Sequence, residues 1–168
     1  MERIAIIDFE ASCLPEAGYS YPIEVALSRV GGRTRSWLIK PARQWFYWDW
    51  CDHAESLHGI SRDMLQEHGT TADAVLAELV AEADGCTVYA DSDLDAHWLE
   101  TLSQACGRSS PFPILFVGEL FRDMQICCEA VSRADLEARQ RLPMRHVACK
   151  DARRLAMTVK LLATPPRA

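Results

Sequence analysis

Two carboxylate residues, Asp8 and Glu10, follow an apolar run near the start of the chain, in the segment RIAIIDFEAS. Residues two apart on a β-strand point to the same face, so we expect both carboxylates to project together. Neighbouring carboxylates repel one another unless they are protonated or bridged by cations. Hard divalent cations such as Mg²⁺ prefer carboxylate oxygens, and the pair therefore indicates a metal site. An isolated pair with this spacing is also typical of a strand that leaves the core into solvent.

A second acidic group, Asp91, Asp93 and Asp95, follows the short apolar run CTVYA at 86–90 and opens a predicted helix. The helix dipole favours aspartate in the first turn, and we expect Asp91 to act as the N-cap. Three carboxylates in five residues exceed what a cap requires. The group therefore indicates a second source of metal ligands.

A third pair, His146 and Asp151, lies around the start of the last predicted helix, at 147–162. Helical spacing lets Asp151 project to one side, while His146 lies in the preceding loop. Histidine changes its protonation near neutral pH, which suits proton transfer in catalysis. Each residue taken alone is also compatible with an ordinary surface position.

The elements that must position these residues alternate between strands and helices. Apolar runs predict strands at 3–8, 22–30, 33–40, 86–90 and 112–117. The second and third strands are joined by Gly31 and Gly32, which indicates an antiparallel hairpin. Helical periodicity predicts helices at 52–67 with a break before a cap at Ser61, and at 70–85, 92–107, 118–131, 133–140 and 147–162. This order predicts an α/β domain with a mixed sheet and helices packed on it.

The composition narrows the function. The 168 residues carry a formal charge of −6 and fit one domain over 1–168, with 164–168 as a frayed tail. The charge argues against a protein that coats duplex DNA, but not against an enzyme that grips a strand end. No apolar stretch is long enough to span a membrane and no secretion signal is recognisable, so we expect no membrane partner and a cytoplasmic location. The seven cysteines are expected to be reduced and mostly buried.

Together, the three motifs resemble those of the DEDDh family of 3′–5′ exonucleases, which includes DnaQ-like proofreading enzymes and ribonuclease T-like enzymes. The first motif is DFE at 8–10 and the third is HVACKD at 146–151. The second, usually N-x-x-x-D, reads DSDLD at 91–95. It places Asp95 at the metal-binding position, and a gap in the alignment would give that place to Asp93. SLHGIS at 56–61 and Glu24 in PIEVALSRV are also similar to family segments.

The resemblance implies a ribonuclease H-like fold, with a five-stranded mixed sheet flanked by helices. It implies an exonuclease, a phosphodiester hydrolase that releases nucleoside 5′-monophosphates from the 3′ ends of single-stranded DNA or RNA. It further implies two Mg²⁺ or Mn²⁺ ions, His146 as the general base, and a set of metal ligands made of Asp8, Glu10, Asp95 and Asp151. The residues that it places near the terminal nucleotide are Phe9, Ala11, Ser12 and His58. For Phe9, core packing is an equally good interpretation.

Other functions remain open from the sequence. A metal-dependent phosphodiesterase with a small substrate would carry the same motifs, and a non-catalytic nucleic-acid-binding module could share the fold. The choice between DNA and RNA, the preference for single strands or duplexes and the formation of a homodimer are also undetermined. The aromatic segment WFYWDW at 45–50 is expected to pack in the core or at an oligomer interface, since stacking on unpaired bases is the less favoured interpretation.

Overall fold

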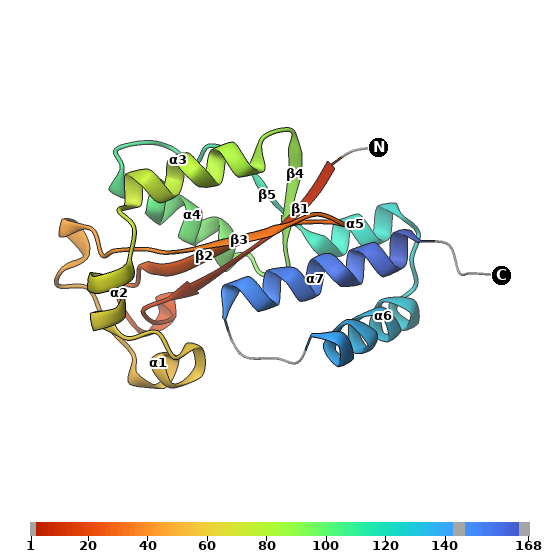
Figure 1. Cartoon of the computed structure of the whole chain (residues 1–168), viewed down its shortest axis with the longest axis horizontal. Helices are drawn as coiled ribbons and strands as arrows, with labels where there is room; N and C mark the ends of the chain where they lie inside the picture. The colour runs from red at the N-terminus through yellow and green to blue at the C-terminus, as the bar shows by residue number, and fades with distance from the viewer. Residues whose placement is uncertain (1–2, 143–146, 165–168) are drawn as a thin grey trace.

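A five-stranded mixed sheet forms the centre of the molecule, in the strand order β3-β2-β1-β4-β5 (Figure 1). The structure, a computed structural model, describes residues 3–142 and 147–164. Strands β1 (Arg3–Ala11), β2 (Pro22–Arg29) and β3 (Thr34–Leu38) are antiparallel neighbours. Strands β4 (Cys86–Ala90) and β5 (Ile114–Phe116) continue the sheet parallel to β1. The predicted fold class, ribonuclease H-like α/β with a five-stranded mixed sheet, is confirmed, and β1 lies at its centre.

Seven helices flank the sheet within the described residues. They are α1 (Asp52–His58), α2 (Arg62–His68), α3 (Ala72–Ala83), α4 (Leu94–Ala105), α5 (Val117–Asp123), α6 (Cys128–Arg141) and α7 (Ala148–Ala163). The hydroxyl of Ser61 accepts a hydrogen bond from the amide of Met64, so the predicted cap of α2 is confirmed. The predicted division into helices at 118–131 and 133–140 is wrong. The chain leaves the helix after Asp123 because Gln125 takes a left-handed conformation, with φ of 57°.

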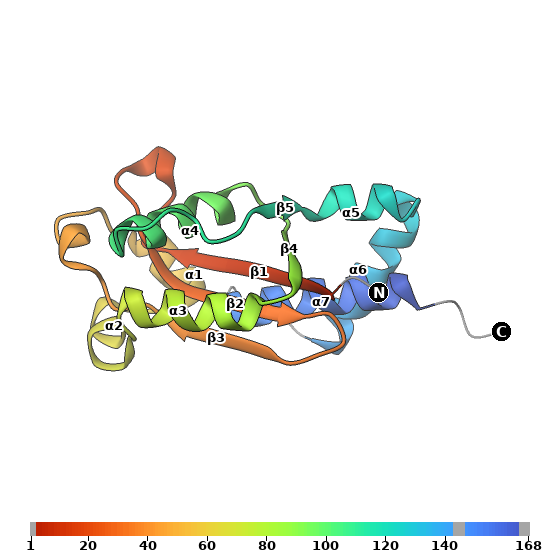
Figure 2. The ribbon, with the colours of Figure 1, turned by 90° about the horizontal axis from the view of Figure 1, so that it is seen from above.

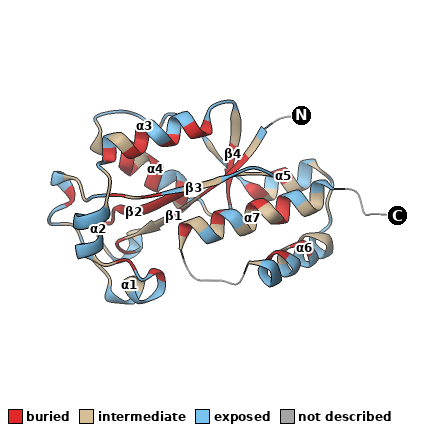
Figure 3. Ribbon diagram, in the orientation of Figure 1, coloured by how far each residue is buried: buried red, intermediate tan, exposed pale blue. Residues whose placement is uncertain are grey.

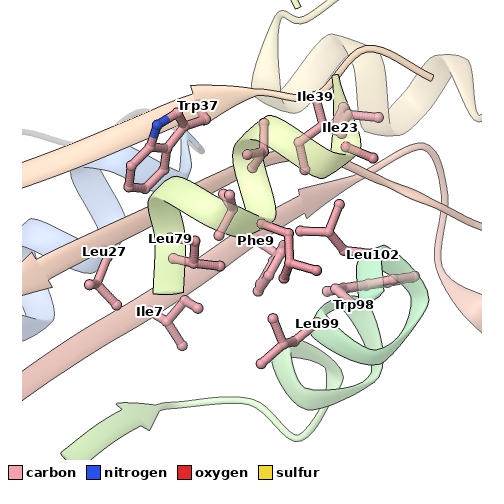
Figure 4. Close-up of a cluster of buried hydrophobic side chains, with 14 of the residues drawn as sticks. Ile7, Phe9, Ile23, Leu27, Trp37, Ile39, Leu79, Trp98, Leu99 and Leu102 are labelled. Atoms are coloured by element: carbon pink, nitrogen blue, oxygen red, sulfur yellow. The ribbon is translucent and has the colours of Figure 1, made fainter. Parts of the chain in front are cut away.

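The two faces of β1 belong to different hydrophobic cores. Ile7 and Phe9 point toward α3 and α4, where they pack with Leu79 and Trp98 (Figure 4). Ile6, on the opposite face, packs against α7. Figures 1 and 2 show the same division, with α3 and α4 on one side of the sheet and α7 on the other. Because side chains alternate along a strand, Asp8 and Glu10 share the face of Ile6 and are directed toward α7.

Burial follows this layered arrangement, and the inward faces of α3 and α7 are buried while α1, α2 and α6 are largely exposed (Figure 3). All seven cysteines are free, as predicted. The expectation that most of them are buried is wrong, because only Cys13 is fully buried, whereas Cys127 and Cys128 at the start of α6 are exposed. Within residues 3–142 and 147–164, no helix has the length and apolar character needed to cross a membrane. Of the tail predicted to be frayed, 165–168 lie outside the described residues.

Candidate metal centre and cleft

Three carboxylates meet where β1 passes the start of α7. Asp8 and Glu10 come from β1, and Asp151 comes from the first turn of α7. One oxygen from each carboxylate lies within 4.8 Å of the others. The prediction that Asp8 and Glu10 share a face is therefore confirmed. The structure brings Asp151 to them from the other end of the sequence, because α7 packs across β1 and β2.

Asp95 approaches the same region from the first turn of α4 and is buried. Its Oδ1 accepts a hydrogen bond of 3.0 Å from the backbone amide of Phe9, the residue between the two β1 carboxylates. Asp95 does not join the three-carboxylate group, but its charge acts on Asp8. Asp93, the alternative at this position, is exposed.

The start of α4 differs from the prediction in one respect. Asp93, rather than Asp91, occupies the N-cap position, and its side chain makes no capping bond. The hydroxyl of Ser92 instead accepts a hydrogen bond from the amide of Leu94. Asp91 is exposed, yet its charge still acts on both Asp8 and Asp95. The predicted capping role of Asp91 is therefore wrong.

Burial and mutual repulsion disturb the protonation of these carboxyl groups. Burial, followed by the charges of Asp95 and Glu10, raises the pKa of Asp8 well above its usual range. Burial and the charge of Glu24 raise the pKa of Glu10 to about 7. Burial and the charge of Asp91 raise the pKa of Asp95 to about 8, although the amide of Phe9 opposes the shift. Such a group of crowded oxygen donors fits a divalent cation, because a cation removes the repulsion that burial intensifies.

One cation already lies beside this group. Nη1 of Arg154 is 2.7 Å from Oδ1 of Asp151, one helical turn away on α7. The same guanidinium is 3.8 Å from Asp135 on α6 and is largely buried. The sequence analysis did not identify this contact, although the spacing of three residues on one helix was a usable signal. Arg154 thus links Asp151 on α7 to Asp135 on α6.

A cleft of about 330 Å³ opens beside the carboxylates. Asp8, Glu10 and Asp95 lie on its wall, and the apolar part includes Leu14, Leu57 and Trp98. The side chain of Leu14 is 59% exposed, so this part of the apolar wall is open to solvent. Sequence reasoning missed Leu14, Leu57 and His53, all of which line the cleft.

Comparison with solved structures identifies this arrangement of elements. The nuclease domain of 3′hExo, a DEDDh family member bound to rAMP, superposes with a TM-score of 0.72 at 18% identity, over 96% of this chain and 91% of that one. E. coli exonuclease I in complex with a dA16 oligonucleotide superposes with a TM-score of 0.71 at 13% identity, over 96% of this chain and 41% of that one. This chain has the fold of the DEDDh exonucleases.

Other comparisons add detail to this result. A 3′-exonuclease that recognises the 3′ end of a histone mRNA stem-loop matches with a TM-score of 0.69 at 18% identity, and the matched region is 63% of its length. This chain thus spans less than half of the exonuclease I chain and under two thirds of that 3′-exonuclease. No family model matches the sequence, and no curated protein matches it. The DEDDh fold is therefore recognised from structure and motifs.

Three of the four residues predicted to meet a terminal nucleotide in this DEDDh fold line the cleft, namely Phe9, Ala11 and His58. Phe9 also packs in the core, so both interpretations of its position apply. Ser12 is fully buried and does not line the cleft. Its hydroxyl accepts a hydrogen bond from the amide of Tyr21, and its carbonyl accepts one from Cys51. The side chain of Ser12 therefore holds the loop after β1 in place.

His58 faces the cleft of the DEDDh fold from the end of α1, and it is buried. Its Nδ1 accepts a hydrogen bond of 3.0 Å from the amide of Ile60, so the proton of the neutral ring lies on Nε2. That Nε2 is buried and has no hydrogen-bond partner within the part of the chain that the structure describes. Burial lowers the pKa of His58, although the charge of Glu55 acts in the other direction. His58 therefore presents an uncharged N–H donor beside the cleft.

The remaining residue of the DEDDh pattern, His146, belongs to 143–146 and lies outside the described residues. The aromatic segment at 45–50 divides into two parts. Trp45 is buried and stacks on Tyr21, with ring centroids 5.4 Å apart, as the packing interpretation predicts. Phe46 and Tyr47 are exposed.

Proposed function

We propose that this chain is a metal-dependent 3′–5′ exonuclease that releases nucleoside 5′-monophosphates from the 3′ ends of single-stranded DNA or RNA. The observation that carries the proposal is the meeting of Asp8, Glu10 and Asp151, with oxygens within 4.8 Å of one another, beside a cleft. The solved structures with this fold support it, since they are named as a 3′-exonuclease or as exonuclease I, and one was solved with rAMP and another with a dA16 oligonucleotide.

Two divalent ions, Mg²⁺ or Mn²⁺, fit this donor set. Asp8, Glu10 and Asp151 would hold them, and Asp95 would contribute from its place beside Asp8. When bound, such a pair of ions supplies a more acidic water and a positive field for the scissile phosphate and the leaving 3′-oxygen. The raised pKa values of Glu10 and Asp95 reflect burial and repulsion between neighbouring carboxylates, which a bound cation would offset as it displaces their protons.

The protein's own residues would orient the substrate and move the proton. His146 would accept the proton of the attacking water, since the ordinary pKa of histidine, about 6.5, suits a base near neutral pH. Nε2 of His58 would donate a hydrogen bond to an acceptor on the terminal nucleotide. Phe9, Ala11 and Leu14 would contact the apolar faces of its base and sugar.

The decisive experiment follows product release from matched single-stranded DNA and RNA oligonucleotides labelled at the 3′-terminal nucleotide, with Mg²⁺, with Mn²⁺ and with EDTA. Replacing Asp8 by Asn removes one metal ligand, and Asp123→Asn makes the same change at an exposed position at the end of α5. We expect labelled monophosphate as the product, stepwise 3′ shortening of a 5′-labelled duplicate, and loss of both in EDTA and in the Asp8→Asn protein. The Asp123→Asn protein should match the wild type. Full activity of Asp8→Asn would contradict the assignment.

A metal-dependent phosphodiesterase that acts on small substrates is the second candidate. The modest volume of the cleft, about 330 Å³, and its mixture of acidic and apolar walls favour it. Dinucleotides and a chromogenic phosphodiester such as bis(p-nitrophenyl) phosphate separate the two functions. Faster turnover of these compounds than of a ten-residue oligonucleotide, with the same dependence on Asp8, would establish the second function.

A further inference from the structure

Helix α7, which carries Asp151, begins without a capping side chain of its own. Its N-cap residue is Val147, which makes no side-chain capping bond because valine has no acceptor. The amides of the first helical turn lack partners within a helix, and burying them unsatisfied is costly. The amides of Lys150 and Asp151 reach the carbonyl of Val147. The amide of Ala148, the first residue of α7, requires another acceptor.

Glu24, on β2, provides that acceptor from 124 positions away in the sequence. Its Oε2 accepts a hydrogen bond of 3.1 Å from the amide of Ala148. The side chain of Glu24 is buried, and its carboxylate meets the positive end of the helix dipole. Glu24 thus performs for α7 the function that a serine or aspartate cap normally performs from within the helix.

The position of Glu24 connects this cap to the metal centre. In the antiparallel ladder, Glu24 lies directly opposite Glu10. The backbone of β2 therefore fixes Glu24 relative to one carboxylate of the cluster. The hydrogen bond to Ala148 fixes the start of α7, and Asp151 lies three residues farther along that helix. A buried carboxylate beside other carboxylates destabilises the fold unless it makes compensating bonds, so its placement here requires a reason.

We propose that Glu24 is a positioning residue, which caps α7 from β2 and thereby holds Asp151 in place against Asp8 and Glu10. The proposal rests on the proposed function only in requiring that the three carboxylates bind a divalent cation. Glu24 lies outside the group formed by Asp8, Glu10 and Asp151, and its Oε2 is already bonded to the amide of Ala148. The proposal therefore assigns Glu24 to the start of α7 and not to the cation. Residues that orient ligands in this way typically change metal affinity about 10- to 100-fold when they are replaced.

Two substitutions of Glu24 separate capping from charge. Glutamine keeps a carbonyl oxygen that can accept the bond from Ala148, whereas leucine has no acceptor. Glu82→Leu is the matched control, because Glu82 is another buried glutamate, on α3, that lies away from the carboxylate cluster and bonds to Arg33. For all proteins we would measure Mn²⁺ binding by calorimetry, and amide hydrogen exchange of the first turn of α7 without metal.

Glu24→Gln should bind Mn²⁺ within about threefold of the wild type, and Glu24→Leu should bind it at least about tenfold more weakly. Amide hydrogen exchange at residues 148–151 should be faster than in the wild type only in the Glu24→Leu protein. Glu82→Leu should retain Mn²⁺ affinity even though its melting temperature falls. Unchanged Mn²⁺ affinity in Glu24→Leu would overturn the proposal, and so would an equal loss in Glu24→Gln, which would make Glu24 a ligand. Failure of the wild type to cleave nucleic acid would overturn only the proposed function, since neither measurement depends on cleavage.

Discussion

Buried or half-buried carboxylates occur at both ends of β1, and their surroundings differ in charge. At the end that includes Asp8 and Glu10, carboxylates crowd against other carboxylates. At the other end, the carboxylate of Glu82 meets Arg33 at 3.0 Å and Arg29 at 3.3 Å. Glu78, one turn earlier on α3, accepts hydrogen bonds from Arg35 at 2.6 Å and from the indole of Trp37 at 2.9 Å.

The protonation of the two ends reflects this difference. The bond from Arg33 is the main cause that lowers the pKa of Glu82, whereas burial and like charges raise the pKa values of Asp8, Glu10 and Asp95. The pairing of Glu82 with Arg33 and Arg29 is the arrangement expected where a carboxylate serves only to stabilise the fold, since the buried charge has partners. At the acidic end, Arg154 pairs with Asp151 but the β1 carboxylates face one another. Protons or cations bound at that end would relieve the repulsion, as expected of a site that binds metal.

Removing one charge at each end should have the largest effect and should act in opposite directions. Asp8→Asn is expected to reduce turnover of oligonucleotides more than about 100-fold, because a direct ligand should matter more than the residues that orient ligands. In EDTA the same protein should melt a few degrees higher than the wild type, because the amide removes the cost of burying a carboxyl group that must either hold a proton or repel its neighbours. Glu82→Gln should leave turnover unchanged. Thermal melts and initial rates measure both effects, and a lower melting temperature for Asp8→Asn in EDTA would contradict the contrast between the ends.

The pH dependence of stability should separate the two ends next. A carboxyl group whose pKa is raised on folding stabilises the protein below its unfolded pKa, near 4, and that stability is lost as pH rises through the folded value. The pKa is about 7 for Glu10 and about 8 for Asp95 in the folded protein, so the metal-free melting temperature should fall between pH 6.5 and 8.5. The lowered pKa of Glu82 contributes no change in this window, because its stabilisation is lost only in acid. His58, whose pKa is lowered, acts in the opposite direction and mainly below pH 6.5.

Melting scans across this pH window in EDTA and in Mn²⁺ measure the effect. The stabilisation by Mn²⁺ should increase with pH, since the ion binds the deprotonated carboxylates and displaces their protons. The Asp8→Asn protein serves as the control and should show a flatter profile in EDTA. A wild-type melting temperature that rises from pH 6.5 to 8.5 in EDTA would show that the carboxylates are not protonated in the metal-free fold.

A substitution at the arginine-paired end of β1 should lower stability and leave turnover unchanged. Glu82→Gln is expected to cost about 1 kcal/mol, because the arginines involved are partly exposed and solvent screens their pairing. For a chain of this size, that loss lowers the melting temperature by roughly 2–4 °C. Glu67→Gln is the control, since Glu67 is exposed near the end of α2 and makes only a distant contact with His68. An equal loss of stability in Glu67→Gln would show that the pairing of Glu82 with the arginines does not stabilise the fold.

The fold could be predicted in outline because most elements have local signals. The apolar run at 3–8 predicted the first strand and the Gly31-Gly32 turn predicted the hairpin, and both are confirmed. The helix boundaries between Val117 and Arg141 could not be predicted. The break at Gln125 has no glycine or proline to mark it, although Gln125 takes a left-handed conformation there. Strand β1 also extends to Ala11, three residues beyond its predicted end, because pairing with β2 continues there.

The site could be predicted where its residues follow a local rule. The two-residue spacing fixed the common face of Asp8 and Glu10, and helix starts placed Asp95 and Asp151. The capping bond that the amide of Ala148 donates to Glu24 joins segments 124 residues apart, so no pattern in the sequence reveals it. The burial of Ser12 likewise depends on the loop that returns through Tyr21 and Cys51. Tertiary contacts, and not local propensity, determine which side chains near a motif reach the cleft.

The smallest expected effect concerns the apolar wall of the acidic end. Leu14 lines the cleft while 59% exposed, and Leu136 on α6 is 57% exposed away from it. Truncating either to alanine should leave the free energy of unfolding nearly unchanged, because neither side chain is packed in the core. Leu14→Ala should raise the KM for an oligonucleotide about fivefold, which corresponds to about 1 kcal/mol of lost apolar contact, and Leu136→Ala should leave it unchanged. Steady-state kinetics on one oligonucleotide can resolve this difference. Equal KM values for the two variants would mean that the exposed leucine at the acidic end does not contact the substrate, and that the carboxylates alone distinguish this end of β1 from the other.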